Sequence, residues 1–292
     1  ITRSNNELAS DENMKVALEA AKKSIVLLKN NNQLLPLKKQ GEKIAIIGPL
    51  ANDKNSPLGN WRSQAVYNSA SSVLEGMKNY KQNKLVYEKG VDLYYGKTNF
   101  HNRVKLNFDD RTGFDKAKLA AENSDIVIMV LGEEGNQSGE GRSRTNIGLP
   151  GLQLELLKEI YKINQNIVLV VMSGRPLDLT WADKNIPAII QAWHLGSKSG
   201  EAIAEVLYGD YNPSGKLTMS FPRNVGQVPI YYNFKNTGRP STSIEQVTNS
   251  GYADVVNSPL YSFGYGLSYT NFKYSNLSID NDKFCLLYTS PS

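Results

Sequence analysis

Cysteine and histidine are scarce in this chain of 292 residues. Cys285 is its single cysteine, so no intrachain disulfide can form. The two histidines, His101 and His194, lie far apart in the sequence. This composition does not favour a zinc-type site, which draws most of its ligands from these two residue types. We therefore predict no metal and no other cofactor.

The chain also lacks long apolar runs and blocks of like charge. Its longest apolar runs, such as residues 167–172, are too short to span a bilayer. The net charge of +5 comes from 33 basic and 28 acidic residues that are spread along the chain. Such a distribution is typical of a solvated surface. We predict neither a membrane nor a nucleic-acid partner.

Sequence motifs for nucleotide binding and for serine hydrolases are absent as well. No strand is followed by Gly-x-Gly-x-x-Gly or a Walker-type loop, and the turn at 47–49 has one glycine and a proline. The stretch 196–200 does not fit the Gly-x-Ser-x-Gly pattern of a nucleophile elbow. A flavodoxin-like nucleotide binder and a serine hydrolase are therefore not favoured.

What the chain does contain is a regular alternation of strand-like and helix-like runs up to Gly209. This pattern predicts an α/β fold, with a mostly parallel sheet flanked by helices in a three-layer α/β/α sandwich. After Gly209 the chain is rich in proline, glycine and aromatic residues. The predicted helices are 11–29, 71–80, 115–123, 152–163 and 199–208, and the predicted strands are 43–49, 84–88, 125–131, 166–172 and 187–193.

A glycine-rich loop with three carboxylates, residues 131–144, follows the buried strand at 125–131. In open α/β sheets ligands bind at the carboxyl ends of the strands. Glu140 lies between two glycines, where the backbone has unusual freedom, and is a candidate acid/base; a solvated loop glutamate is the alternative. Glu133 and Glu134 are closer to the strand and can be structural, bonded to backbone or to an arginine.

Trp61 lies in the loop after the strand at 43–49, at the same sheet edge as Glu140. Its indole could stack on the apolar face of a sugar, or it could be a packed surface tryptophan; both interpretations stay open. We expect Trp181 and Trp193 in or near the core. The 16 tyrosines suit a carbohydrate-binding surface without specifying one.

An ordered set of segments resembles the C-terminal half of the glycoside hydrolase family 3 β-glucosidases. The likeness covers nearly all of residues 15–273, and the ordered set is far more specific than any one segment. The segments are Ser24-Ile25-Val26-Leu27-Leu28-Lys29-Asn30, Leu35-Pro36-Leu37, Ile44-Ala45-Ile46-Ile47-Gly48-Pro49, Ser138-Gly139-Glu140-Gly141-Arg142-Ser143-Arg144, Ser173-Gly174-Arg175-Pro176-Leu177, Gly209-Asp210-Tyr211-Asn212-Pro213-Ser214-Gly215-Lys216-Leu217, Ser220-Phe221-Pro222, Asn236-Thr237-Gly238-Arg239-Pro240 and Leu260-Tyr261-Ser262-Phe263-Gly264-Tyr265-Gly266-Leu267-Ser268-Tyr269.

The resemblance implies a division of the chain. Family members join an N-terminal (β/α)8-type barrel to an α/β sandwich, and many add a fibronectin type III-like β-domain. We expect residues 1–30 to be a connecting segment with the first helix, 31–235 the sandwich with the acid/base loop, and 236–270 a linker. Residues 271–292 would be the truncated start of the β-domain, with a tail that looks non-native.

The resemblance also implies a retaining, exo-acting hydrolase of terminal non-reducing β-D-glucosyl residues. Two carboxylates roughly 5–5.5 Å apart carry such a reaction. In the family the nucleophile is an aspartate on the barrel, and the acid/base is a glutamate that matches Glu140. Trp61 matches an aromatic that helps to form the subsite for the leaving sugar. Ile1-Thr2-Arg3 looks like the middle of a longer protein, and the barrel with its nucleophile aspartate is missing, so we expect the chain alone to be inactive.

The partners implied are a β-linked oligosaccharide or glycoside substrate and the N-terminal barrel in cis. A periplasmic or secreted location is favoured over a cytoplasmic one. The alternative function is a non-catalytic carbohydrate-binding or interaction module. The choice between glucosides, xylosides and other sugars stays open.

Overall fold

The computed structural model describes residues 9–62, 64–241 and 244–279. A six-stranded sheet forms its centre, in the order β1-β6-β5-β4-β2-β3. β1 runs antiparallel to β6, and the other neighbours are parallel. The strands are β1 (Val26–Asn30), β2 (Gln40–Ile47), β3 (Gln82–Glu88), β4 (Ile126–Gly132), β5 (Ile167–Met172) and β6 (Ala188–Gln191). The predicted mostly parallel sheet is confirmed.

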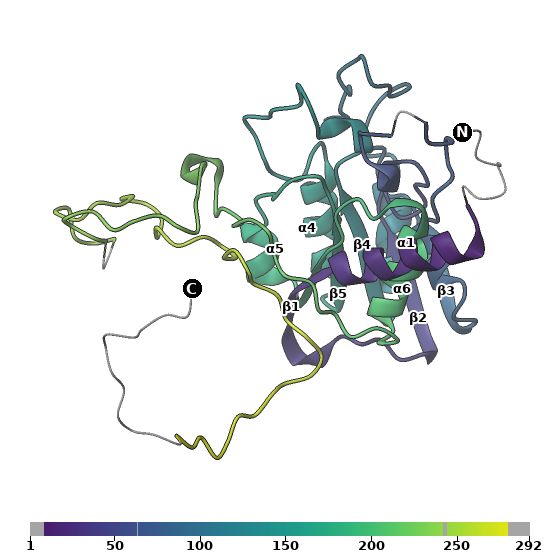
Figure 1. Ribbon diagram of the computed structural model, residues 1–292. Helices are drawn as coiled ribbons and strands as arrows, with labels where there is room; N and C mark the ends of the chain where they lie inside the picture. Colours follow the sequence, from purple (N-terminus) through teal and green to yellow (C-terminus); the bar gives the residue numbers. More distant parts are fainter. Residues whose placement is uncertain (1–8, 63, 242–243, 280–292) are drawn as a thin grey trace, which may run out of the picture.

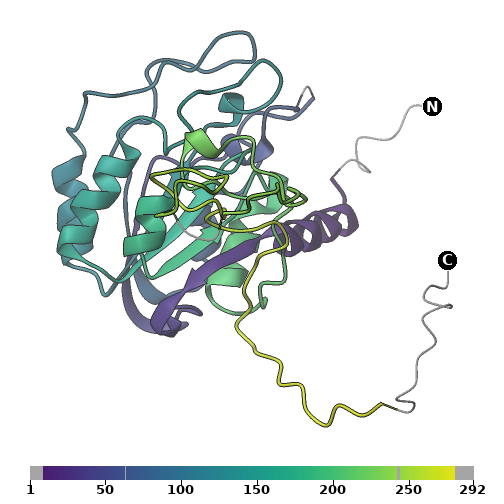
Figure 2. The same ribbon diagram turned by 90° about the vertical axis from the view of Figure 1, so that its left-hand side faces the viewer.

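Helices cover both faces of the sheet, as predicted. α1, α2 and α6 pack on one face, and α3, α4 and α5 pack on the other. Figure 1 shows α1 and α6 on one side with α4 and α5 opposite, and Figure 2 turns the sandwich by 90°. The helices are α1 (Asp11–Ser24), α2 (Val73–Met77), α3 (Phe114–Glu122), α4 (Gln153–Ile163), α5 (Thr180–Asn185) and α6 (Ser199–Leu207).

The central strands form because their sequences are apolar on both sides. Every residue of β4 and β5 is buried, which is the pattern of a parallel strand with helices above and below it. In β4, Ile126 and Ile128 face the α1–α2–α6 layer, whereas Val127 and Met129 face the α3–α4–α5 layer. No helix in the part of the chain that the structure describes is long and apolar enough to cross a membrane.

The predicted helix at 11–29 was wrong from Ile25 onward. Ser10 caps α1 by accepting a hydrogen bond from the Asn13 amide, and the helix ends at Ser24. Residues 26–30 form β1, which pairs with β6 at the edge of the sheet. The short helix α5 was not predicted. The helix expected at 71–80 is shorter, since α2 covers only Val73–Met77.

After α6 the chain runs mostly without regular structure but returns to the core. Phe221 and Tyr261 are buried and form an antiparallel bridge, and Leu267 forms another with Leu27 of β1. Residues 271–279 contain no helix or strand, and 280–292 lie outside the described residues. The start of a β-domain at 271–292 and the domain boundaries therefore stay predictions.

Candidate active site

The loop that leaves β4 is anchored by a buried ion pair at Glu133. Its carboxylate is fully buried. Arg144 Nη1 lies 2.6 Å from its Oε1, and Arg175 Nε lies 3.0 Å from the same atom. Arg144 belongs to the loop itself, whereas Arg175 follows β5. Glu133 therefore connects the loop to the segment after the neighbouring strand and has a structural role, which the sequence left open.

Glu134 is the second structural carboxylate of this loop. It is 1% exposed and caps the short 3-10 helix Gly135–Gln137, where it accepts a 2.7 Å bond from the Asn136 amide. Thr98 donates a further bond of 3.0 Å from the loop after β3. Burial raises the pKa of Glu134, although these hydrogen bonds oppose the shift. The Glu134 carboxylate thus hydrogen-bonds both its own loop and the loop after β3, which gives it a structural role.

Glu140 is the exposed carboxylate at the tip of the loop. Both flanking glycines adopt positive φ, +112° at Gly139 and +68° at Gly141, which other residues rarely tolerate. A Cβ on Gly139 would lie 2.6 Å from Oδ1 of Asn60. The tip of the Glu140 loop therefore lies directly against the residue that precedes Trp61.

Trp61 is 71% exposed and lines a cavity of about 490 Å³. Its ring meets Phe100 edge to face, with centroids 6.4 Å apart. Phe100 comes from the loop after β3 and was not singled out from the sequence. The only available signal was its place in a polar stretch at the same sheet edge.

Arg142 connects Phe100 to the Glu140 loop. Its guanidinium lies 5.8 Å from the Phe100 ring centroid and also donates to the Phe100 carbonyl. Arg175 in turn donates a 2.9 Å bond to the Arg142 carbonyl. The structure thus brings Trp61, Phe100 and the Glu140 loop together from three loops at the carboxyl ends of β2, β3 and β4.

Trp181 and Trp193 lie elsewhere and are partly buried against the α3–α4–α5 core. Within the described ranges, no group of three or more His, Cys, Asp or Glu side chains could hold a metal ion. The three loops place an exposed carboxylate, Glu140, at the same end of the sheet as the exposed rings of Trp61 and Phe100. Exposed aromatic rings can pack against an apolar ligand face, and an exposed carboxylate can exchange a proton.

Comparison with known proteins gives a consistent result over most of the chain. Residues 25–269 match the Glycosyl hydrolase family 3 C-terminal domain. The chain is 43% identical over 277 residues to the periplasmic beta-glucosidase of Salmonella typhimurium, covering 91% of this chain and 36% of that protein. It is 38% identical over 286 residues to a beta-xylosidase of Formosa agariphila, covering 94% and 36%.

Solved structures agree with the sequence relatives. The beta-glucosidase from Listeria innocua in complex with isofagomine matches with a TM-score of 0.82 at 33% identity, covering 93% of this chain and 36% of that one. The same enzyme has been crystallised with glucose, and a variant of it with laminaribiose. The chain thus spans about a third of the length of the curated relatives, which is 36% for the two described above.

Proposed function

Because the chain belongs to glycosyl hydrolase family 3 through its C-terminal domain, we propose that it is the C-terminal part of a retaining, exo-acting β-glycosidase. In this proposal the enzyme removes terminal non-reducing β-D-glucosyl residues, and Glu140 is its general acid/base. The observation that carries the proposal is the difference in burial among the three carboxylates of the loop. Glu133 and Glu134 are buried and make structural bonds, whereas Glu140 is exposed in a loop whose Gly139 lies against Asn60, the residue before Trp61.

The proposed chemistry needs a second carboxylate, which attacks the anomeric carbon and forms a glycosyl-enzyme. Glu140 gives its proton to the leaving oxygen in that step. It then takes a proton from the water that releases the sugar. The nucleophile is proposed to be an aspartate on an N-terminal barrel in cis. Residues 1–292 expressed alone should therefore not hydrolyse glycosides.

Trp61 is proposed to stack on the leaving sugar. Support comes from its 71% exposure and from the contact between Asn60, the residue before it, and Gly139 of the Glu140 loop. The substrate is proposed to be a β-linked glucoside or oligosaccharide, because the Salmonella and Listeria relatives are beta-glucosidases. The periplasmic Salmonella relative likewise supports a periplasmic or secreted location.

A chimera tests the acid/base role. Residues 25–269 would replace the matching segment of the Salmonella beta-glucosidase, and Glu140→Ala would be compared with the unmodified chimera. Hydrolysis of cellobiose should fall about 10²–10⁴-fold, because its leaving oxygen needs a proton. Formation of the glycosyl-enzyme from 2,4-dinitrophenyl β-glucoside should be nearly unchanged, because that leaving group departs without one. Added azide should then yield β-glucosyl azide.

Glu122→Gln is the matched control, since exposed Glu122 precedes β4 and lies at the opposite edge of the sheet. It should behave as the unmodified chimera. Equal losses on both substrates in Glu140→Ala would refute the acid/base role. An active chimera that is indifferent to Glu140→Ala would instead favour the alternative, a carbohydrate-binding module, which the Trp61 cavity also supports.

A further inference from the structure

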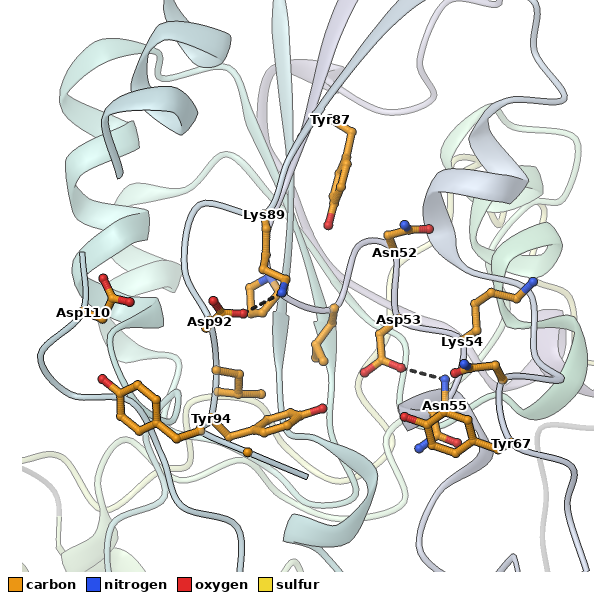
Figure 3. A pocket seen from close by; sticks show the side chains of 16 residues that line it. Asn52, Asp53, Lys54, Asn55, Tyr67, Tyr87, Lys89, Asp92, Tyr94 and Asp110 are labelled. Atoms are coloured by element: carbon orange, nitrogen blue, oxygen red, sulfur yellow. Dashed lines mark hydrogen bonds and ion pairs between the residues drawn. The ribbon is translucent and has the colours of Figure 1, made fainter. Parts of the chain in front are cut away.

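A second cavity lies at the carboxyl ends of β2 and β3 and has a volume of about 670 Å³. None of its lining residues belongs to the Glu140 loop. Figure 3 shows Tyr87, from the end of β3, pointing into it between Lys89 and the loop that carries Asp53. Tyr94 and Tyr67 lie across its lower side. We name it the β2–β3 cavity.

The charges around the β2–β3 cavity are mostly satisfied within the protein. Lys89 pairs with Asp92 at 2.5 Å, and Lys54 pairs with Glu75 at 2.8 Å. Asp53 accepts hydrogen bonds from the amides of Asn55 and Ser56. Three aspartates against two lysines leave the lining slightly acidic, which disfavours a phosphate or nucleotide ligand.

The tyrosines that line the β2–β3 cavity suit a neutral, hydroxyl-rich ligand. Tyr67 is 69% exposed and offers a ring face. Burial raises the pKa of Tyr94 to about 12, and burial likewise raises the pKa of Tyr87, so both phenols keep their protons as donors. The backbone of Tyr94 is fixed by a bridge to Leu106. Aromatic faces with a few fixed polar groups are the usual composition of a small-molecule site.

The β2–β3 cavity continues into the Trp61 cavity. Asn55 and Tyr67 line both. Asn60 lines the Trp61 cavity and is only 7% exposed, and its buried Oδ1 has no hydrogen-bond partner among the residues that the structure describes. A buried acceptor without a partner is costly unless a ligand or water supplies a donor. The two cavities thus adjoin at Asn55 and Tyr67, and the Trp61 cavity also reaches Asn136 of the Glu140 loop.

We propose that the β2–β3 cavity is a second carbohydrate site, which holds the reducing-end sugars of a β-linked oligosaccharide whose preceding sugar lies on Trp61. The direction of the oligosaccharide rests on the proposed function, because it places the cleaved bond at Glu140. The binding itself needs only residues of this chain. Ligands of three or more sugars should therefore bind better than disaccharides.

Isothermal titration calorimetry on the 292-residue chain tests this. Cello- and laminari-oligosaccharides of two to five sugars would be titrated into wild type, Tyr67→Ala, Tyr94→Ala and Tyr274→Ala. Wild-type affinity should rise about tenfold from the disaccharide to the longer ligands, which corresponds to about one good aromatic contact. Tyr67→Ala and Tyr94→Ala should lose this gain. Tyr274→Ala should keep it, since Tyr274 is 93% exposed and lies outside both cavities.

Affinity that does not depend on length, or no binding at all, would overturn the proposal. So would a length gain that survives in Tyr67→Ala, which removes an exposed ring and should fold normally by circular dichroism. Glu140→Gln should bind the longer ligands like wild type. If Glu140→Ala contradicted the acid/base role but affinity still rose with oligosaccharide length, the second carbohydrate site would remain supported. If the acid/base role held but affinity did not rise with length, only the second site would be refuted.

Discussion

Glu133→Gln tests whether a buried ion pair holds the Glu140 loop in place. The substitution keeps the size of the side chain but removes a charge that is fully buried. Arg144 and Arg175, whose side chains are 18% and 19% exposed, would each lose their anionic partner. Arg175 also donates a hydrogen bond to the Arg142 carbonyl. If Arg175 is no longer held by Glu133, this bond should weaken and the Glu140 loop should become more mobile.

The expected cost is about 3 kcal/mol of unfolding free energy, near the lower limit for removing one partner of a buried pair. The lower limit applies because both arginines retain some solvent. The midpoint of thermal unfolding should fall by about 6–12 °C. Urea unfolding followed by circular dichroism measures the free energy, and hydrogen exchange of amides 138–148 measures the loop.

Glu155→Gln is the matched control. Glu155 also pairs with an arginine, Arg111, at 2.6 Å, but both side chains are about half exposed, at 44% and 45%. Water screens such a pair, so its loss should change stability little. If Glu133→Gln lowered the free energy of unfolding no more than Glu155→Gln does, burial would not strengthen the Glu133 ion pair, and the reasoning would be refuted.

Two further predictions concern buried titratable groups. His194 is partly exposed, but burial of its ring lowers its pKa from 6.5 to about 4. The unfolded chain therefore binds a proton first as pH falls, and going from pH 7 to 5 should cost about 2 kcal/mol. Urea unfolding at both pH values would measure the free energy of unfolding. Between pH 7 and 5, His194→Gln should lose less of it than wild type, whereas His101→Gln, at an exposed histidine, should lose as much as wild type. An equal loss in His194→Gln and wild type would contradict this. Tyr261→Phe removes a 2.6 Å bond to Asp183 and should cost about 1.5–3 kcal/mol. Urea midpoints would show it, and Tyr252→Phe, at an exposed tyrosine, should change less.

The sequence predicted most of the sheet because its central strands are uniformly apolar. It failed at β1, whose apolar residues continue directly from α1 and fit a helical stripe as well as a strand. Only the pairing of Val26 with Gln191 and Leu27 with Ile190 resolves this ambiguity. That pairing joins residues far apart in the chain, which periodicity cannot show.

The sequence also predicted the candidate site only in part. Loop position and the family resemblance pointed to Glu140 and Trp61. The contacts that join them were not predictable, because Phe100 and Arg142 meet across two loops without regular spacing. The structural roles of Glu133 and Glu134 were open in the sequence and were decided by their burial.

The bridge between Leu27 and Leu267 has a consequence for association between copies of the chain. β1 lies at the end of the sheet, and the amide of Leu267 donates a 2.8 Å bond to the carbonyl of Leu27. An uncovered edge strand offers its backbone groups to strands of other molecules. The segment around Leu267 therefore covers part of this edge strand, and with the register break between Leu27 and Lys29 it should make pairing with a strand of another molecule less favourable.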